Sequence, residues 1–150
     1  MGGVITSQTK FKLDYNTRGI AIRYVRKYSE YKRRLAEKRD DIRLSTPPPP
    51  DGQPKSGTPG DSTARKAQLL LELENTHEAK VVKAVEKARD LIGDDLFASE
   101  DREMLRREIW DACLGRISFV HTKCSMIMGE TKFWEYRRQF LRAICDELGL

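Results

Sequence analysis

Apolar side chains recur at three-, four- and seven-residue steps through the segment RGIAIRYVRKYSEYKRRLAEKRDDIRL. This spacing places them on one face of an α-helix and predicts a single long amphipathic helix. The apolar positions are Ile20, Tyr24, Tyr28, Tyr31, Leu35 and Ile42. The basic residues that lie largely off this face are Arg23, Arg26, Lys27, Arg33 and Arg34.

A second helix is predicted over residues 64–92, after the segment TPPPPDGQPKSGTPGDST at 46–63, which holds all six prolines. Proline removes a backbone donor and disfavours helix before it, so this segment is predicted to be a loop. Asp61, Ser62 or Thr63 would cap the second helix, and Gly93 would end it. Its apolar positions include Leu69, Leu70, Leu73, Val81, Val85, Ala88 and Ile92. Because two amphipathic helices cover each other most simply as an antiparallel pair, we expect a hairpin over 15–92, with its loop at 45–63 and a flexible N-terminus at 1–14.

A different pattern begins at Ser99, which is predicted to cap a third helix with acidic residues in its first turn. The predicted buried face of that helix comprises Met104, Leu105, Ile109, Trp110 and Cys113. Gly115 would close it, and a short helix in ISFVHTKCSMIMG would be capped by Ser118 and ended by Gly129. A last helix, ETKFWEYRRQFLRAICDEL, follows. Nothing alternates with period two, so the sequence predicts an all-α protein with a second domain at 97–150.

The last helix presents an apolar stripe and a polar side that is concentrated near its start. The stripe comprises Phe133, Phe140, Leu141, Ile144, Cys145 and Leu148. A short helix, a glycine turn and a basic helix together are typical of a helix-turn-helix, whose second helix enters the DNA major groove. Arg and Lys can bind guanine or phosphate, and Glu can accept from cytosine. The predicted DNA contacts are Lys123, Thr131, Lys132, Trp134, Glu135, Arg137, Arg138 and Arg142, although Trp134 and Tyr136 by themselves are more typical of packing residues.

Charge is spread unevenly along the 150 residues, whose net charge is +5. Residues 1–44 carry +7, residues 45–98 carry −2, and residues 99–150 are neutral. A basic arm favours a polyanion or an acidic surface, although a solvated helix face has the same composition. Arg23, Arg26, Lys27, Arg33 and Arg34 are therefore candidate contacts with DNA or a polymerase.

Other classes of function have weaker support. The three cysteines, Cys113, Cys124 and Cys145, form no CxxC pair, and with His121 they lack zinc-finger spacing, so we expect neither disulfides nor a metal. The sequence contains no Gly-rich phosphate loop, G-x-S-x-G or H-E-x-x-H motif, so we expect no enzyme and no cofactor.

No apolar run approaches membrane-spanning length. The start, MGGVIT, matches the short myristoylation pattern at Gly2 and Thr6, which with the basic arm would make a membrane-surface anchor.

Three stretches resemble one known family. They are the basic, Tyr-rich IRYVRKYSEYKRRLAEKRDDI, the segment STPPPPDGQPKSGTPGDSTARKAQLLLELE, and the ending TKFWEYRRQFLRAICDELGL. Over nearly its whole length the chain is similar to phage late-gene transcriptional activators of the RinA and ArpU type. The resemblance implies a C-terminal half like region 4 of a bacterial sigma factor. It also implies duplex promoter DNA and host RNA polymerase as partners, and the bacterial cytoplasm, at the nucleoid, as the location.

The resemblance also bears on particular residues. Lys132, Phe133 and Trp134 stand where the family has its T-F-Y, and Arg137 and Arg138 stand at its basic pair. One departure is that the family has a small alanine in the first helix of the motif, where this chain has Cys124 or Ser125. The alternative to a DNA-binding activator is a helical adaptor or structural protein, in which the two long helices pair subunits into a homo-oligomer.

Overall fold

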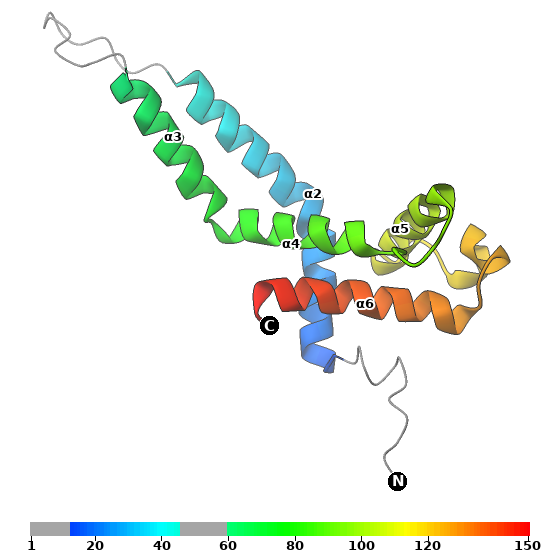
Figure 1. The fold of residues 1–150 in the computed structure, drawn as a ribbon. Helices are drawn as coiled ribbons and strands as arrows, with labels where there is room; N and C mark the ends of the chain where they lie inside the picture. The colour runs from blue at the N-terminus through cyan, green and yellow to red at the C-terminus, as the bar shows by residue number, and fades with distance from the viewer. Residues whose placement is uncertain (1–12, 46–59) are drawn as a thin grey trace, which may run out of the picture. The chain divides into compact units, whose positions relative to one another are not determined.

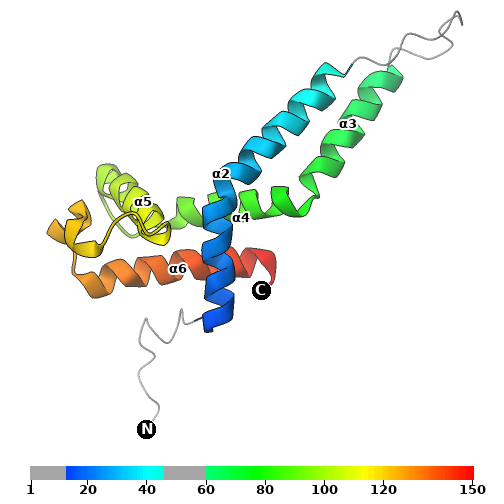
Figure 2. The ribbon, with the colours of Figure 1, turned by 180° about the vertical axis from the view of Figure 1, so that it is seen from behind.

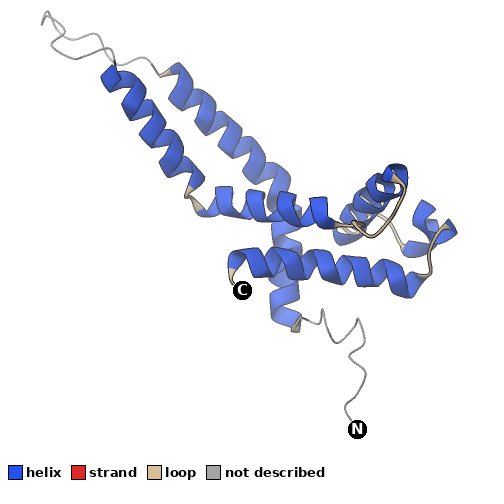
Figure 3. Cartoon of the chain, viewed as in Figure 1, coloured by secondary structure: helices blue, strands red, loops and turns tan. Residues whose placement is uncertain are grey.

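The computed structural model describes residues 13–45 and 60–150. Within these ranges the chain forms five α-helices and two short 3-10 helices, and it contains no strand, which confirms the all-α class (Figures 1 and 3). The predicted flexible N-terminus up to residue 12, the Gly2 and Thr6 pattern and loop residues 46–59 lie outside the described residues. The helices are α2 (Tyr15–Leu44), α3 (Gly60–Glu74), α4 (His77–Leu91), α5 (Ser99–Cys113), η1 (Phe119–His121), η2 (Lys123–Met126) and α6 (Glu130–Leu148).

The described chain divides into two compact units. One unit combines residues 13–28 with Lys83–Leu150, and the other is Ser29–Val82. The long helices α2 and α4 each contribute residues to both units. The division therefore falls within these helices, whereas the sequence-based boundary was placed between residues 92 and 97.

In the first unit α4 and α6 run antiparallel, and polar contacts join α6 to α4 and to the connection that follows α4. Near one end Lys87 forms an ion pair of 2.7 Å with Glu147. Near the other end the Tyr136 hydroxyl donates to the Asp95 carboxylate, with oxygen–oxygen distances of 2.7 and 2.8 Å. The buried residues of α6 are Phe133, Tyr136, Phe140, Leu141, Ile144 and Cys145.

Four helices of this unit meet around Trp110 of α5. Its ring lies 5.2 Å from that of Tyr28 on α2, edge to face, and 6.2 Å from that of Phe140 on α6. The Arg89 guanidinium of α4 lies over both Tyr28 and Trp110, at 5.6 and 5.4 Å from the ring centroids. Aromatic edges and a cation over aromatic faces are favourable arrangements. This cluster joins the first half of α2 to α4, α5 and α6. In both views of the ribbon this part of α2 crosses α4 and α6 (Figures 1 and 2).

The second unit is an antiparallel pair made by Ser29–Leu44 of α2 and by α3, with the first turns of α4 beneath them (Figure 1). Lys66 donates to the carbonyl of Arg43 at 3.1 Å, and Arg34 lies 3.6 Å from Glu78. Helix α3 begins at Gly60, four residues before the predicted start, so Ser62 and Thr63 belong to its first turn and do not precede it.

The predicted helix over 64–92 is wrong in one respect, because Asn75 and Thr76 break it into α3 and α4. The Thr76 hydroxyl donates to the carbonyl of Leu73 at 2.7 Å and accepts from the amide of Ala79 at 3.3 Å. A threonine that bonds in this way starts a new helix, since it satisfies an amide that the helix itself leaves open. Apolar residues continue on both sides of the break, so periodicity alone did not reveal it.

The connection before α6 also differs from the prediction. The short helix expected in ISFVHTKCSMIMG is replaced by η1 and η2, which are separated only by Thr122. Thr122 caps η2 by accepting from the amide of Ser125 at 3.2 Å, while the hydroxyl of Ser118 contacts His121 at 2.8 Å and caps nothing. Two α-helices joined by a tight turn, as in a helix-turn-helix, are therefore not seen over residues 99–148, and α5 is the α-helix that precedes α6.

The predicted ends of α4 and α5 are confirmed at Gly93 and Gly115, which have φ values of +74° and +72°. Glycine adopts this left-handed conformation without the strain that a side chain brings. At Gly93 a Cβ would also lie 3.2 Å from a methyl carbon of Leu105. Ser99, by contrast, is the first residue of α5, and the residue in the capping position is Ala98, which forms no side-chain cap.

Replacing Thr76 by alanine tests the helix break. We expect Thr76→Ala to lower the free energy of unfolding by about 0.5–2 kcal/mol, because the amide of Ala79 loses its acceptor. Urea denaturation followed by circular dichroism measures the change. Thr63→Ala is the matched control, since Thr63 is exposed within α3 and alanine there favours helix. Equal stability of the Thr76 variant and the parent would contradict the capping role.

Candidate nucleic-acid interface

Helix α6 has one buried side and one outer side. Phe133, Phe140 and Ile144 are at most 1% exposed and define the buried side. The outer side carries polar residues at steps of four, three and four, which align along a helix. These residues are Thr131, Glu135, Arg138 and Arg142. Four of the predicted contacts thus share one stripe on the surface of α6.

Arg138 differs from its neighbours on this stripe. Its side chain is half-buried, and its Nε and Nη2 atoms are shielded from solvent without a hydrogen-bond partner among the described residues. A guanidinium normally places its donors on carboxylates, carbonyls or water, and a donor left without an acceptor costs free energy. Arg138 is therefore a cation that the folded chain positions on α6 without supplying acceptors for these donors.

Lys132, Glu135 and Arg142 are engaged in surface ion pairs. The Lys132 ammonium lies 4.0 Å from Asp95 and 3.8 Å from Glu135, and it stands 5.1 Å from the centre of the Tyr136 ring. Arg142 donates to Asp146 at 3.1 Å. The pairs of Lys132 with Asp95 and of Arg142 with Asp146 join largely exposed side chains and contribute between about 0 and 1 kcal/mol, so a phosphate group can displace these two carboxylates at little cost. The Glu135 side chain is only 15% exposed.

Trp134 and Arg137 contact other side chains of the protein, although the buried Nε of Arg137 also has no hydrogen-bond partner among the described residues. The Trp134 indole N–H donates to Glu130 at 3.1 Å, and its ring meets Phe133 edge to face at 5.1 Å. The Arg137 guanidinium lies 5.4 Å from the Trp134 ring, on the side of α6 that also carries buried Phe133 and Leu141. Arg137 and Arg138 are thus neighbours in sequence whose side chains leave the helix about 100° apart. Of the two, Arg138 alone belongs to the outer stripe.

Lys123 is held through its backbone by a residue that sequence reasoning missed. The Glu108 carboxylate accepts from the amide of Lys123 at 2.7 Å and from the amide of Cys124 at 2.8 Å, while the Lys123 side chain is exposed. Charge-assisted bonds to the first amides of a helix satisfy donors that the helix leaves open. The sequence did contain one sign of this role, because Glu108 lies three positions after Leu105 on a stripe of α5 that is otherwise apolar.

The basic residues predicted on α2 fall into two groups. Arg33 pairs with Glu37 at 2.8 Å, and Arg34 pairs with Glu30 at 2.6 Å, both within the second unit. In the first unit, Arg23, Arg26 and Lys27 are exposed, and none of them forms an ion pair within 4.0 Å among the described residues. Their charges are not neutralised within this part of the chain. These three residues are called the α2 cations below.

Burial raises the pKa of several other side chains in this unit. Burial, followed by the hydrogen bond to Asp95, raises the pKa of Tyr136, so this phenol stays protonated and donates. Burial also raises the pKa values of the Cys113, Cys124 and Cys145 thiols, and the Arg137 guanidinium partly opposes this at Cys113. The three thiols are free and buried, as expected for cysteines that act as small apolar residues.

No family model, curated protein or solved structure matches this chain. The resemblance to phage activators therefore stays a prediction. Among residues 13–45 and 60–150, no three His, Cys, Asp or Glu side chains are arranged to hold a metal ion. None of the helices in the same ranges combines the length and the apolar character needed to cross a membrane.

Removing the Glu108 carboxylate tests its hold on the segment before α6. Glu108→Ala leaves the amides of Lys123 and Cys124 without an acceptor, so we expect a loss of about 1–3 kcal/mol in the free energy of unfolding. Hydrogen exchange of these two amides should speed up more than that of α6. Glu103→Ala removes an exposed carboxylate from the same helix and should change stability by less than about 0.5 kcal/mol. Unchanged exchange at Lys123 and Cys124 would refute this role.

Proposed function

We propose that this protein is a transcriptional activator that binds duplex promoter DNA through the outer stripe of α6 and recruits RNA polymerase to that site. The observation that carries the DNA-binding part is the unsatisfied guanidinium of Arg138, which lies on the same stripe as Thr131 and Arg142. Guanine O6 and N7, or two phosphate oxygens, offer the paired acceptors that a guanidinium fits. Because these donors are shielded from solvent in the folded chain, the Arg138 side chain would turn outward to place them on the acceptors of a bound duplex.

The start of α6 supports the same proposal. Gly129 occupies the capping position and forms no side-chain bond, so no side chain at this position covers the first amides of the helix. Uncapped amides at a helix N-terminus attract phosphate through their N–H groups and the helix dipole. Thr131 is exposed in this first turn and can donate to a phosphate or a base edge.

The α2 cations supply attraction that does not depend on base sequence. Helix α2 carries ten basic and four acidic residues, which is a net charge of +6. Cations without a carboxylate partner release counterions from DNA when they bind phosphates, and this favours binding at low salt. We therefore assign specific contacts to α6 and a general phosphate contact to the α2 cations.

Recruitment of polymerase needs a second surface for a protein partner. Val120 and Met126 of the 3-10 helices are 78% and 87% exposed, and the next residue, Ile127, is 47% exposed. Apolar side chains that gather at the surface are typical of protein docking sites. The activator role itself rests on the resemblance to phage late-gene activators, and this exposed group gives the polymerase contact a candidate location.

Arg138→Ala tests the specific contact. A preferred duplex is first selected from a random-sequence pool with the parent protein, and fluorescence anisotropy then compares that duplex with a shuffled one. We expect Arg138→Ala to weaken binding to the selected duplex by about 1–3 kcal/mol, or roughly 5- to 150-fold, if the guanidinium binds a guanine. Binding to the shuffled duplex should change much less.

Arg65→Ala is the matched control for the loss of charge, because Arg65 is exposed on α3 in the other compact unit. It should leave the ratio between the two duplexes unchanged. The proposal fails if the parent protein enriches no sequence from the pool. The assignment of Arg138 fails if its variant binds the selected duplex as tightly as the parent does.

The α2 cations make a separate prediction about salt. Replacing Arg23, Arg26 and Lys27 together by glutamine should weaken binding to both duplexes by similar factors. It should also reduce the slope of log affinity against log salt by about two to three, close to one unit for each phosphate that the variant no longer binds. The measurement is a titration at several salt concentrations. An unchanged slope would show that these side chains do not contact phosphate.

A further inference from the structure

The ammonium group of Lys132, beside the outer stripe of α6, lies among three groups of the protein. Its Nζ atom is 4.0 Å from an oxygen of Asp95, 3.8 Å from an oxygen of Glu135 and 5.1 Å from the centre of the Tyr136 ring. The Lys132 side chain is nevertheless 46% exposed, so a ligand can still reach it from solvent. Lys132 is thus an accessible cation whose charge the protein already balances.

The carboxylate of Asp95 is held in place beside Lys132. The Tyr136 hydroxyl donates to its two oxygens at 2.7 and 2.8 Å, and the Tyr136 residue itself is only 2% exposed. Glu135 projects from α6, as Lys132 does, whereas Asp95 comes from the connection between α4 and α5. A carboxylate from another segment is therefore fixed next to this lysine by a buried phenol.

A phosphate group binds proteins through the same two kinds of contact, since it accepts from hydroxyl groups and pairs with cations. We propose that Asp95 is an internal competitor of DNA phosphate for Lys132, and that it lowers the affinity of the protein for every duplex. This inference rests on the proposed DNA-binding function. Lys132 can pair fully with a phosphate only when it leaves Asp95.

The competition between Asp95 and phosphate also affects the salt dependence of binding. A lysine that binds a phosphate releases a counterion from DNA, so each such contact weakens binding as salt rises. When Lys132 leaves Asp95, the exposed carboxylate attracts cations from solution again, which offsets part of this release. The contact of Lys132 should therefore add less to the salt dependence than the contact of an unpaired lysine would.

Asp95→Asn tests the competition, because asparagine keeps an oxygen that can accept from the Tyr136 hydroxyl but removes the charge. We expect the variant to bind both the selected and the shuffled duplex about two- to fivefold more tightly at low salt, since exposed ion pairs contribute this little. The slope of log affinity against log salt should become steeper by about 0.5–1. Fluorescence anisotropy at several salt concentrations measures both effects, and circular dichroism checks the fold.

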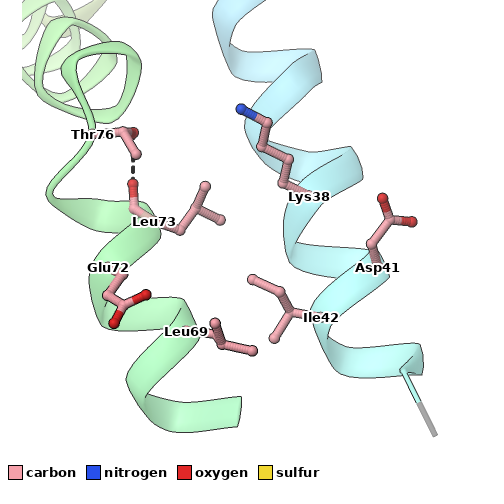
Figure 4. Close-up of a pocket in the computed structure, with 7 residues that line it drawn as sticks. All are labelled: Lys38, Asp41, Ile42, Leu69, Glu72, Leu73 and Thr76. Carbon is pink, nitrogen blue, oxygen red and sulfur yellow. Dashed lines mark hydrogen bonds between the residues drawn. The ribbon is translucent and has the colours of Figure 1, made fainter. Parts of the chain in front are cut away.

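Two matched variants control for the loss of one negative charge. Asp94→Asn changes the neighbouring residue, whose side chain is 60% exposed and lies 3.6 Å from Arg106 of α5. Asp41→Asn changes an exposed residue at the groove between α2 and α3, in the other compact unit (Figure 4). Neither variant should steepen the salt dependence. An Asp95→Asn variant with the affinity and slope of Asp94→Asn overturns the inference.

Lys132→Gln gives a second measurement that leaves Asp95 unchanged. It should reduce the slope by less than about half a unit in the parent and by more in the Asp95→Asn background, where the charge of Lys132 is less balanced. A reduction of a full unit in the parent, or equal reductions in both backgrounds, overturns the inference. A parent protein that enriches no sequence contradicts the proposed function instead, and the shuffled duplex then still tests the competition. A parent that binds no duplex at all overturns both.

Discussion

The fold depends on the burial of the apolar stripe of α6. Phe133, Phe140, Leu141 and Ile144 are almost fully enclosed, and each such side chain contributes about 1.5–3 kcal/mol when it leaves water. The residues that enclose them come from both ends of the chain, since the thiol of Cys145 lies 4.0 Å from the carbonyl of Thr17 near the start of α2. Because this stripe faces the core, the opposite side of α6 must face outward. The candidate interface is therefore a consequence of how the core forms.

Polar contacts fix the ends of that arrangement. Asp95, in the connection between α4 and α5, accepts from the Tyr136 hydroxyl and also lies 4.0 Å from Lys132, so it ties this connection to the first turns of α6. Glu108 holds the start of η2, which leads directly into α6. Carboxylates that bond backbone amides or a buried hydroxyl specify geometry more sharply than apolar contacts do. Asp95 and Glu108 thus fix the start of α6 from two different segments of the chain.

The sequence predicted the helical class well because apolar side chains recur at helical spacing, most clearly in α6. Gly93 and Gly115 also marked helix ends correctly, since few other residues adopt positive φ. The break at Thr76 was missed because it depends on one hydroxyl, which apolar spacing does not register. The start of η2 was missed because its first amides are held by Glu108, which is distant in sequence.

The candidate site was only partly predictable for a similar reason. Arg137 and Arg138 are equivalent in the sequence, yet helical geometry sends one toward the buried side and the other to the outer stripe. Which basic residues are neutralised depends on carboxylates that tertiary structure brings close, such as Asp95 beside Lys132. Residue type alone therefore identified both Lys132 and Arg138 as candidate DNA contacts. Only the folded chain separates a paired cation from an unsatisfied one.

Contact between the outer stripe of α6 and duplex DNA is the central proposal. Nuclear magnetic resonance of the ¹⁵N-labelled full chain, titrated with a duplex selected by the protein itself, measures this contact most directly. We predict the largest shifts at the amides of Thr131, Glu135, Arg138 and Arg142 and at the side-chain Nε of Arg138, with smaller shifts at residues 23–27. Spectra that do not change, or changes confined to residues 60–74 of α3, would contradict it.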